Sequence, residues 1–309
     1  MRFITNAFII PSARSAKIEA LLLKSHGLPH AKIASILQID EGTLWPPDDP
    51  IARYHWEHAM AKIIERPAKF VERAFKTRVY LDARGNRLPF RLYAPRTIAT
   101  GRSYPLVLFF HGKGERGTDN CSTLLYPFWK VFIKKLSRRF PCFIFVPQCP
   151  AQDWWVHVNH YAKTHRMPSQ PSRPERLALK AIASLQRELP IDLRRLYVTG
   201  LSMGGFCTWD LVARNPDLFA AAVPICGGGD ETKARRIARV PLWVFHGDQD
   251  NTIPVARSRN MVAALRKAGK RPRYTEYPGV GHDSWNPAYS DPKLWKWLFT
   301  QTNRRGLDY

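Results

Sequence analysis

A serine in a glycine-rich turn is the first residue whose surroundings predict chemistry. It lies in the run Gly200-Leu201-Ser202-Met203-Gly204-Gly205, directly after the apolar segment 196–199 and before a segment with helical character. A serine on a tight strand-to-helix turn projects its hydroxyl from the edge of a sheet, and small neighbours allow the strained backbone of such a turn. Free N–H groups at the start of the following helix favour an oxyanion. The pattern predicts that Ser202 is a nucleophile.

A serine hydroxyl needs a base, and both an acid and a histidine follow Ser202 in the chain. Asp250 comes after the candidate strand 242–246, and His282 comes after the candidate strand 273–277 as the only histidine in the last 60 residues. In this order an imidazole can take the serine proton and return it to the leaving group, while a carboxylate fixes its tautomer. We therefore expect a triad of Ser202, Asp250 and His282.

Three neighbouring residues leave alternatives open. Asp248 lies nearer the end of its candidate strand and is the main rival of Asp250 as the carboxylate. Asp283 adjoins His282 in sequence, and we expect it to face solvent or to cap a local turn. His246 ends the strand, and we expect it to form structural hydrogen bonds rather than to act as a second base.

An oxyanion hole needs two backbone N–H donors aimed at the oxygen that gains charge. Met203, at the start of the helix after Ser202, is expected to supply one. The loop His111-Gly112-Lys113-Gly114-Glu115-Arg116-Gly117 should supply the other, with Lys113 favoured and Gly112 as the alternative. The loop lacks the G-x-x-x-x-G-K-[ST] pattern of a P-loop, which disfavours phosphate transfer.

The chain from about residue 75 alternates short apolar runs with longer amphipathic segments, as strands alternate with helices. We expect strands at 77–81, 91–94, 106–111, 142–146, 196–199, 221–225, 242–246 and 273–277, and helices at 124–136, 174–189, 203–215, 233–238, 255–268 and 292–301. Gly85-Asn86 joins the first two strands as a hairpin, and helices join the later ones. This order predicts an α/β fold with a mostly parallel eight-stranded sheet flanked by helices. Residues 148–174 have neither period and predict an irregular segment.

Together these residues resemble the α/β-hydrolase superfamily. The matching phrases are His111-Gly112-Lys113-Gly114-Glu115-Arg116-Gly117, Pro147-Gln148-Cys149-Pro150, Tyr197-Val198-Thr199-Gly200-Leu201-Ser202-Met203-Gly204-Gly205, Thr208-Trp209-Asp210, Pro224-Ile225-Cys226-Gly227-Gly228-Gly229, His246-Gly247-Asp248-Gln249-Asp250 and Tyr277-Pro278-Gly279-Val280-Gly281-His282-Asp283-Ser284-Trp285. They run through almost all of 69–309. The chain is similar to the bacterial carboxylesterase and predicted-peptidase branch, which includes polyhydroxybutyrate depolymerases, feruloyl esterases and dienelactone hydrolases. The resemblance implies a serine esterase with Ser202, Asp250 and His282 as triad, and no metal ion or other cofactor.

Two features depart from that branch. Lys113 occupies a place where its members usually carry a small residue, so the lysine side chain could narrow the acyl site or favour an anionic substrate. Members are commonly exported, whereas residues 1–10 hold an apolar run too short for the core of a signal peptide. We therefore expect a cytoplasmic protein, with export possible only from a different start.

Residues 1–68 follow another pattern and predict a small helical N-terminal extension of unknown role before a catalytic domain at 69–309. Helical periodicity occurs at 16–25, 30–37 and 51–64. Residues 30–44 resemble the first helix and turn of a helix-turn-helix, but Pro46 and Pro47 fall where the recognition helix should run.

The chain carries 48 Lys and Arg against 25 Asp and Glu, a net charge of +23. Such an excess attracts phosphate backbones and anionic lipid. Residues 1–68 hold eight basic and seven acidic side chains, so nearly all of the excess is spread over 69–309 without a dense basic run. This distribution disfavours a nucleic-acid partner. No segment reaches the roughly 18 apolar residues of a membrane helix, so no membrane partner is expected.

Aromatic, histidine and cysteine side chains remain to be placed. Trp155, in the irregular segment, and Trp285, three residues after His282, are candidate substrate contacts, with core packing as the alternative role. Histidines 157, 160 and 165 lack partners at ligand spacing, so no zinc site is expected. Buried thiols are expected at Cys121, Cys142, Cys149, Cys207 and Cys226.

The leading functional hypothesis is a serine carboxylesterase that acts on a small-molecule or polymer-linked ester. A serine peptidase of prolyl-oligopeptidase type would use the same three side chains. A nucleic-acid-associated protein and a catalytically silent binding module are hypotheses from other classes. A nucleic-acid-binding role predicts salt-dependent DNA binding that is indifferent to loss of the Ser202 hydroxyl. Oligomeric state and the identity of the ester do not follow from the sequence.

Overall fold

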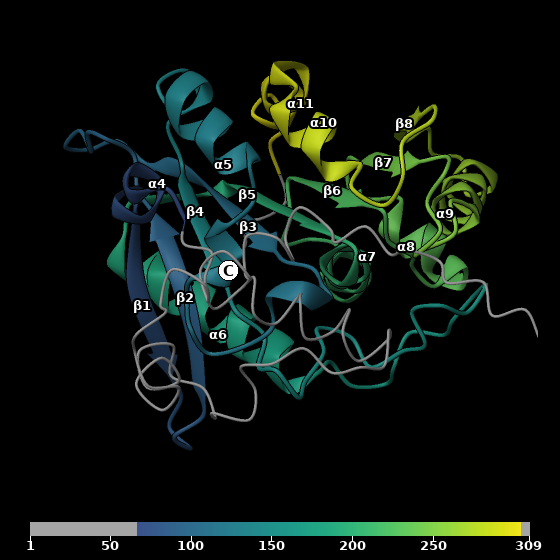
Figure 1. The fold of residues 1–309 in the computed structure, drawn as a ribbon, viewed down its shortest axis with the longest axis horizontal. Helices are drawn as coiled ribbons and strands as arrows, with labels where there is room; N and C mark the ends of the chain where they lie inside the picture. The colour runs from purple at the N-terminus through teal and green to yellow at the C-terminus, as the bar shows by residue number, and fades with distance from the viewer. Residues whose placement is uncertain (1–66, 304–309) are drawn as a thin grey trace, which may run out of the picture. The chain divides into compact units, whose positions relative to one another are not determined.

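The structure, a computed structural model, describes residues 67–303 (Figure 1). Spatial contacts divide the chain into Met1–Arg66 and Pro67–Tyr309. The helices expected at 16–25, 30–37 and 51–64, and the helix-turn-helix-like segment, lie outside the described residues. None of the described helices is both long enough and apolar enough to cross a membrane.

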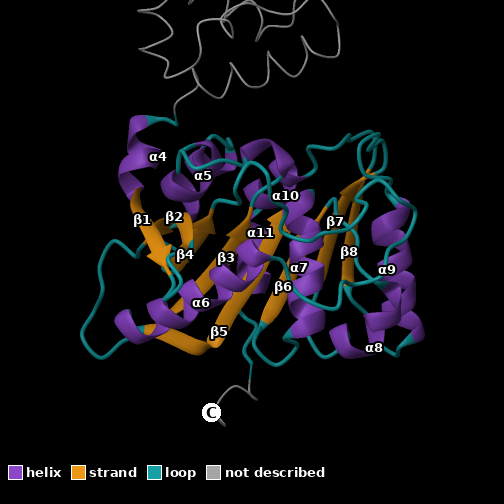
Figure 2. Cartoon of the chain, turned by 90° about the horizontal axis from the view of Figure 1, so that it is seen from below, coloured by secondary structure: helices purple, strands orange, loops and turns teal. Residues whose placement is uncertain are grey.

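One eight-stranded sheet runs through the described part of the chain (Figure 2). Its strands are β1 (Phe75–Leu81), β2 (Arg87–Tyr93), β3 (Tyr104–Phe110), β4 (Phe143–Pro147), β5 (Ile191–Leu201), β6 (Ala221–Ile225), β7 (Trp243–Gly247) and β8 (Arg273–Tyr277). Their order across the sheet is β1-β2-β4-β3-β5-β6-β7-β8. Strand β2 pairs antiparallel with β1 and β4, and the other pairs are parallel. The predicted hairpin and the mostly parallel eight-stranded sheet are confirmed.

Helices cover both faces of this sheet. They are α4 (Lys69–Ala74), α5 (Phe128–Val131), α6 (Arg173–Glu188), α7 (Met203–Arg214), α8 (Ala234–Ile237), α9 (Ala256–Lys267), α10 (Trp285–Ser290) and α11 (Pro292–Leu298). Apolar side chains of α6, α7, α8 and α9 belong to one buried cluster, and those of α4, α5, α10 and α11 to another. Figure 1 shows α5 and α11 on the opposite side of the strands from α6.

The central strand β3 explains why helices are needed on both faces. All seven of its residues are buried. Leu106 and Leu108 pack into the cluster of α6–α9, whereas Val107 and Phe109 pack into the cluster of α4, α5, α10 and α11. Because successive strand side chains point to opposite faces, a continuously apolar strand requires a cover on each side.

Two helical predictions are wrong in detail. The single helix expected at 124–136 is instead a 3₁₀ turn at Ser122–Leu124, then α5, then a π-helical turn at Phe132–Leu136. Pro127 lacks the N–H that a continuous helix would need there. Helix α10 lies where no helix was expected. Its Pro287 falls in the first turn, where proline is tolerated because the N–H groups there have no intrahelical acceptor. No helix or strand occurs within 148–172, as expected for the irregular segment.

Candidate active site

The strand-to-helix turn places Ser202 between β5 and α7. Ser202 adopts φ 52° and ψ −120°, a conformation that residues other than glycine seldom adopt. Its N–H donates to Ile225 O at 3.0 Å and to Cys226 Sγ at 3.3 Å, which fixes the turn against the end of β6. Such a conformation costs of order 1–3 kcal/mol and persists only where the surroundings hold it. The turn presents the serine hydroxyl at the carboxyl edge of the sheet.

Glycine is required on both sides of this turn by close backbone approach. A Cβ atom on Gly204 would lie 2.0 Å from Phe110 O of β3. A Cβ on Gly200 would lie 2.4 Å from Gly204 O. The backbones of β3, β5 and α7 therefore pack closely because these two residues have no side chain.

The structure brings the three predicted side chains into one hydrogen-bonded chain. His282 Nε2 lies 2.9 Å from Ser202 Oγ, and His282 Nδ1 lies 2.7 Å from Asp250 Oδ2. The loops after β7 and β8 supply Asp250 and His282, at the same edge of the sheet as the end of β5. Since a carboxylate accepts, His282 Nδ1 carries the proton and Nε2 can accept the proton of Ser202.

Asp250 is held rigidly for this contact. Its Oδ1 accepts the N–H groups of Thr252 and Ile253, each at 2.9 Å. Burial opposes ionisation, but hydrogen bonds from His246 and His282 outweigh it and hold the pKa of Asp250 well below its usual range. Asp250 therefore stays a carboxylate at neutral pH, and its two oxygens have separate tasks.

The alternative residues have other partners. Asp248 Oδ1 accepts the N–H of Gly279 at 2.7 Å. Asp283 is exposed, and its carboxylate lies 3.3 Å from the Asn286 side-chain amide. His246 is fully buried, with Nδ1 2.7 Å from Ser258 Oγ and Nε2 2.9 Å from Ile253 O. Its Nε2 also lies 3.2 Å from Asp250 Oδ2, a contact that sequence reasoning did not foresee.

The loop after β3 lies beside Ser202. A Cβ atom on Gly112 would lie 3.7 Å from the Cβ of Ser202. The Gly112 N–H already donates to the Tyr126 hydroxyl at 3.1 Å, which disfavours it as an oxyanion donor. Burial and the charge of Glu115 raise the pKa of Tyr126 well above its usual value, and its hydroxyl donates to that carboxylate.

His111 orients the next peptide of this loop. Its Nε2 accepts the N–H of Cys149 at 2.9 Å, so Nδ1 carries the proton and donates to Gly112 O at 2.6 Å. In a trans peptide the N–H points opposite to the C=O, so the Lys113 N–H points away from the His111 ring. Lys113 and Met203 each begin a helix, where N–H groups have no intrahelical acceptor.

Of the two tryptophans predicted to touch substrate, Trp155 requires a correction. It is fully buried, its ring packs edge-on against Phe110 and His111, and its Nε1–H donates to His111 O. It anchors the irregular segment to the end of β3 and cannot contact a ligand. Trp285 is half-buried, with its ring 5.3 Å from that of His282, so it remains a candidate.

Sequence reasoning missed Tyr126, His111 and Cys226 as parts of this site. Tyr126 has no signal in its own segment, since its role depends on a glycine 14 residues earlier. His111 directly precedes the glycine-rich loop, and a histidine at that place was a signal that could have been used. Cys226 follows β6, and its Sγ, an Asp250 oxygen and a His282 nitrogen all lie within 4.8 Å of one another.

The side chain of Lys113 lies over an aromatic ring. Its Nζ is 5.6 Å from the centroid of Trp154, and the guanidinium of Arg116 is 4.4 Å from the same centroid. His160 stacks on that ring at 4.8 Å. Burial, then the neighbouring charges, lower the pKa of His160 to about 4, so this histidine is neutral at pH 7.

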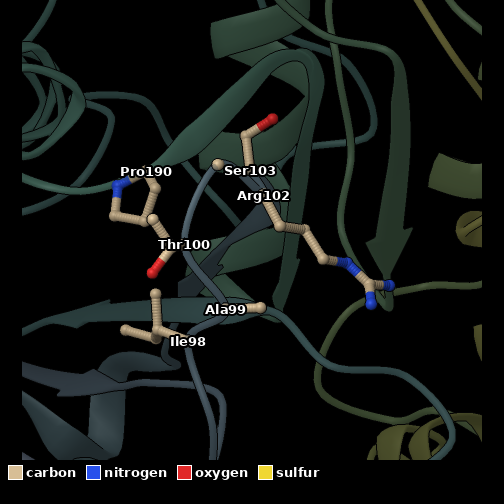
Figure 3. A pocket seen from close by; sticks show the side chains of 7 residues that line it. Ile98, Ala99, Thr100, Arg102, Ser103 and Pro190 are labelled. Atoms are coloured by element: carbon tan, nitrogen blue, oxygen red, sulfur yellow. The ribbon is translucent and has the colours of Figure 1, made fainter.

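A cavity of about 350 Å³ at the opposite edge of the sheet is separate from these residues (Figure 3). It is lined by residues 98–103 and by Pro190, which directly precede β3 and β5. Ser202 follows the other end of β5. None of the residues that line this cavity is a histidine, a cysteine or an acid, so it lacks groups for acid–base chemistry.

The sheet order and the turn at Ser202 define an α/β-hydrolase fold, and the chain is a member of that superfamily. Residues 161–292 match the dienelactone hydrolase family. The chain is similar to a solved structure of a thermostable esterase, with 38% identity and a TM-score of 0.68 over 75% of this chain and 64% of that one.

Two curated relatives agree with this placement. A protein of Escherichia coli (strain K12), assigned by name to the carboxymethylenebutenolidases, is 31% identical over 32% of this chain. A protein of Oryza sativa subsp. japonica, assigned by name to the carboxylesterases, is 26% identical over 61% of this chain and 75% of its own length. The match to the Escherichia coli protein spans only 41% of the length of that relative.

Proposed function

We propose that this protein hydrolyses carboxylic esters through an acyl-enzyme on Ser202. The observation that carries the proposal is the continuous chain from Ser202 Oγ to His282 and on to Asp250, with contacts of 2.9 and 2.7 Å. The similarity to a thermostable esterase and to a protein named as a carboxylesterase supports ester hydrolysis as the general reaction.

In the first half of the reaction, Ser202 Oγ attacks the ester carbonyl carbon. His282 Nε2 takes the hydroxyl proton, and Asp250 stabilises the imidazolium through Nδ1–H. Collapse of the tetrahedral intermediate breaks the bond to the alcohol oxygen, which receives the proton from Nε2. In the second half a water molecule gives its proton to Nε2 and attacks the acyl-enzyme, and the acid product leaves as Ser202 regains its proton.

The backbone N–H groups of Met203 and Lys113 would bind the oxyanion. Proline at 113 tests the second donor, because it removes the N–H and fits a first helical position. Gly112, at φ −75° and ψ −178°, already has the extended backbone that a residue before proline prefers. We expect Lys113→Pro to lower kcat by about 10²–10³. Lys113→Ala keeps the N–H and should keep kcat within about a factor of ten of the wild type.

The decisive experiment uses the full chain and its Ser202→Ala variant. Both are assayed with p-nitrophenyl acetate, p-nitrophenyl butyrate and an aminoacyl p-nitroanilide, and both are treated with a fluorophosphonate probe. We expect ester turnover and labelling in the wild type and loss of both in the variant. Faster turnover of the anilide than of the esters would indicate a peptidase instead. A folded wild type that is inactive and unlabelled would overturn the proposal and favour a test of DNA binding across a salt series.

A further inference from the structure

Cys226 is a buried thiol at the triad to which the proposed reaction gives no task. It directly follows β6, is fully buried, and its Sγ accepts the N–H of Ser202 at 3.3 Å. Burial first, and then the charge of Asp250, raise the pKa of this thiol. Without a bound cation the sulfur therefore stays protonated and unreactive at neutral pH.

The groups around this sulfur form a set of ligands. Cys226 Sγ, a carboxylate oxygen of Asp250 and a ring nitrogen of His282 lie within 4.8 Å of one another. The Ser284 hydroxyl is also buried, and it lies close enough to Cys226 to lower the pKa of that thiol. Thiolate, imidazole and carboxylate are the ligands of tetrahedral Zn²⁺ sites in proteins.

We infer that Cys226, Asp250 and His282 form an inhibitory site for Zn²⁺ and for similar thiophilic divalent cations such as Cd²⁺. Inhibition of ester hydrolysis by the cation rests on the proposed function, whereas binding of the cation does not. The bound ion is a regulator of the triad and not a cofactor. Cys226 is the residue that distinguishes the site from an ordinary pair of histidine and carboxylate.

Charge and protons balance in the bound state. The Cys226 thiol releases its proton to solvent, and the thiolate and the Asp250 carboxylate together neutralise the two charges of the cation. His282 binds through Nδ1, so its single proton moves to Nε2. Nε2 then donates to Ser202 Oγ instead of accepting from it, and the serine has no base. Capture of the cation therefore stops acylation without any change in the nucleophile.

The three side chains could coordinate a tetrahedral cation after small movements. Zinc binds sulfur at about 2.3 Å and nitrogen or oxygen at about 2.0–2.2 Å, so ligand atoms in a tetrahedral site lie about 3.3–3.7 Å apart. The contact of 2.7 Å between His282 and Asp250 must widen, and no distance to Cys226 exceeds 4.8 Å, so the sulfur needs to move by about 1 Å at most. The His282 side chain is 23% exposed whereas that of Asp250 is fully buried, so the cation would enter along the imidazole.

The first test measures inhibition. ZnCl₂ is titrated into the wild type, Cys226→Ser and Cys142→Ser during p-nitrophenyl butyrate hydrolysis, and EDTA is then added. Cys142 is a matched control because it is also fully buried with a raised thiol pKa. We expect reversible inhibition of the wild type and of the control. Loss of the sulfur ligand should raise the half-inhibiting Zn²⁺ concentration of Cys226→Ser about 10-fold or more, relative to its own uninhibited rate.

The second test measures binding without activity. CdCl₂ is added to the same three proteins and to Ser202→Ala, and the ultraviolet charge-transfer band of a cadmium thiolate is recorded. The band should form in the wild type, Cys142→Ser and Ser202→Ala, and should be missing in Cys226→Ser, whose folding is checked by circular dichroism. A wild type without the band, or equal Zn²⁺ sensitivity in Cys226→Ser, would overturn the inference. An inactive wild type that still shows the band would overturn the proposed function and leave the cation site standing.

Discussion

Replacement of Asp250 by asparagine separates the task of each of its carboxylate oxygens. Oδ1 accepts two backbone N–H groups, and Oδ2 accepts the Nδ1–H of His282. An asparagine must keep its carbonyl oxygen on the two backbone donors, because turning its NH₂ toward them would leave buried donors unpaired at about 1–3 kcal/mol each. Its NH₂ then faces His282 Nδ1 and donates to it. The imidazole proton moves to Nε2, where Ser202 needs an acceptor.

The expected loss follows from this tautomer. A wrong imidazole tautomer in a serine triad lowers kcat by about 10⁴, which corresponds to about 5 kcal/mol of activation free energy. KM should change little if the ester does not touch Asp250. The assay is kcat and KM for p-nitrophenyl butyrate, normalised to the fraction of enzyme that a fluorophosphonate labels after long exposure.

Asp248→Asn is the matched control for this variant. Asp248 has the same side chain two residues earlier, but its Oδ1 accepts the N–H of Gly279 and the carboxylate has no contact with His282. We expect this variant to retain most of its kcat. A larger loss in Asp248→Asn than in Asp250→Asn would refute the assignment, and so would an Asp250→Asn enzyme that keeps more than a tenth of the wild-type rate.

Three further predictions concern the framework of the site. Gly204→Ala should lower the free energy of unfolding by about 1–3 kcal/mol or more, because its Cβ would lie 2.0 Å from a backbone oxygen. Gly114→Ala, whose Cβ would have no atom within 4 Å, should leave the stability unchanged. Thermal unfolding of the two variants tests both expectations. Burial and a neighbouring acid raise the pKa of Glu175 in the folded protein. Above the pKa of the unfolded chain this carboxyl ionises more readily on unfolding, so it lowers the stability of the fold. Glu175→Gln should therefore raise Tm by about 2–4 °C at pH 7 and leave it unchanged at pH 4. Trp155→Ala should cost about 3–5 kcal/mol of unfolding free energy, whereas Trp285→Ala should mainly change KM across p-nitrophenyl esters of rising acyl length.

The sequence was sufficient for the sheet because its strands carry strong local signals. Strands β6 and β8 were predicted at 221–225 and 273–277, where they occur, and the other six strands differ only at their ends. The turn at Ser202 could be predicted because close backbone approach requires glycine at positions 200 and 204, and glycine is directly visible in the sequence. Local pattern and tertiary packing agree at these positions.

The loop after β3 contains contacts that the local sequence could not predict. The sequence could not decide between the backbone N–H groups of Gly112 and Lys113, because both belong to the same loop. The difference comes from the hydroxyl of Tyr126 and the ring of His111, which reach the loop from a distant segment and from the end of β3. Trp155 was misplaced for the same reason, because burial of one ring depends on every segment that covers it. Contacts between distant segments leave no periodic trace.

The choice between Asp248 and Asp250 depends on how two loops are joined. Asp248 accepts the N–H of Gly279, and its own N–H donates to Tyr277 O, so it fastens the loop after β7 to the loop after β8. Asp250 lies two residues further on and uses Oδ1 to close its own loop, which leaves Oδ2 for His282 and for the longer contact with His246. Because the first carboxylate positions the loop that carries His282 and the second contacts the imidazole, both acids would serve the proposed proton transfer by different contacts. Sequence spacing alone could not distinguish Asp248 from Asp250, because both follow the same strand and either could have faced His282. The hydrogen bond from the Gly279 N–H to Asp248 distinguishes them.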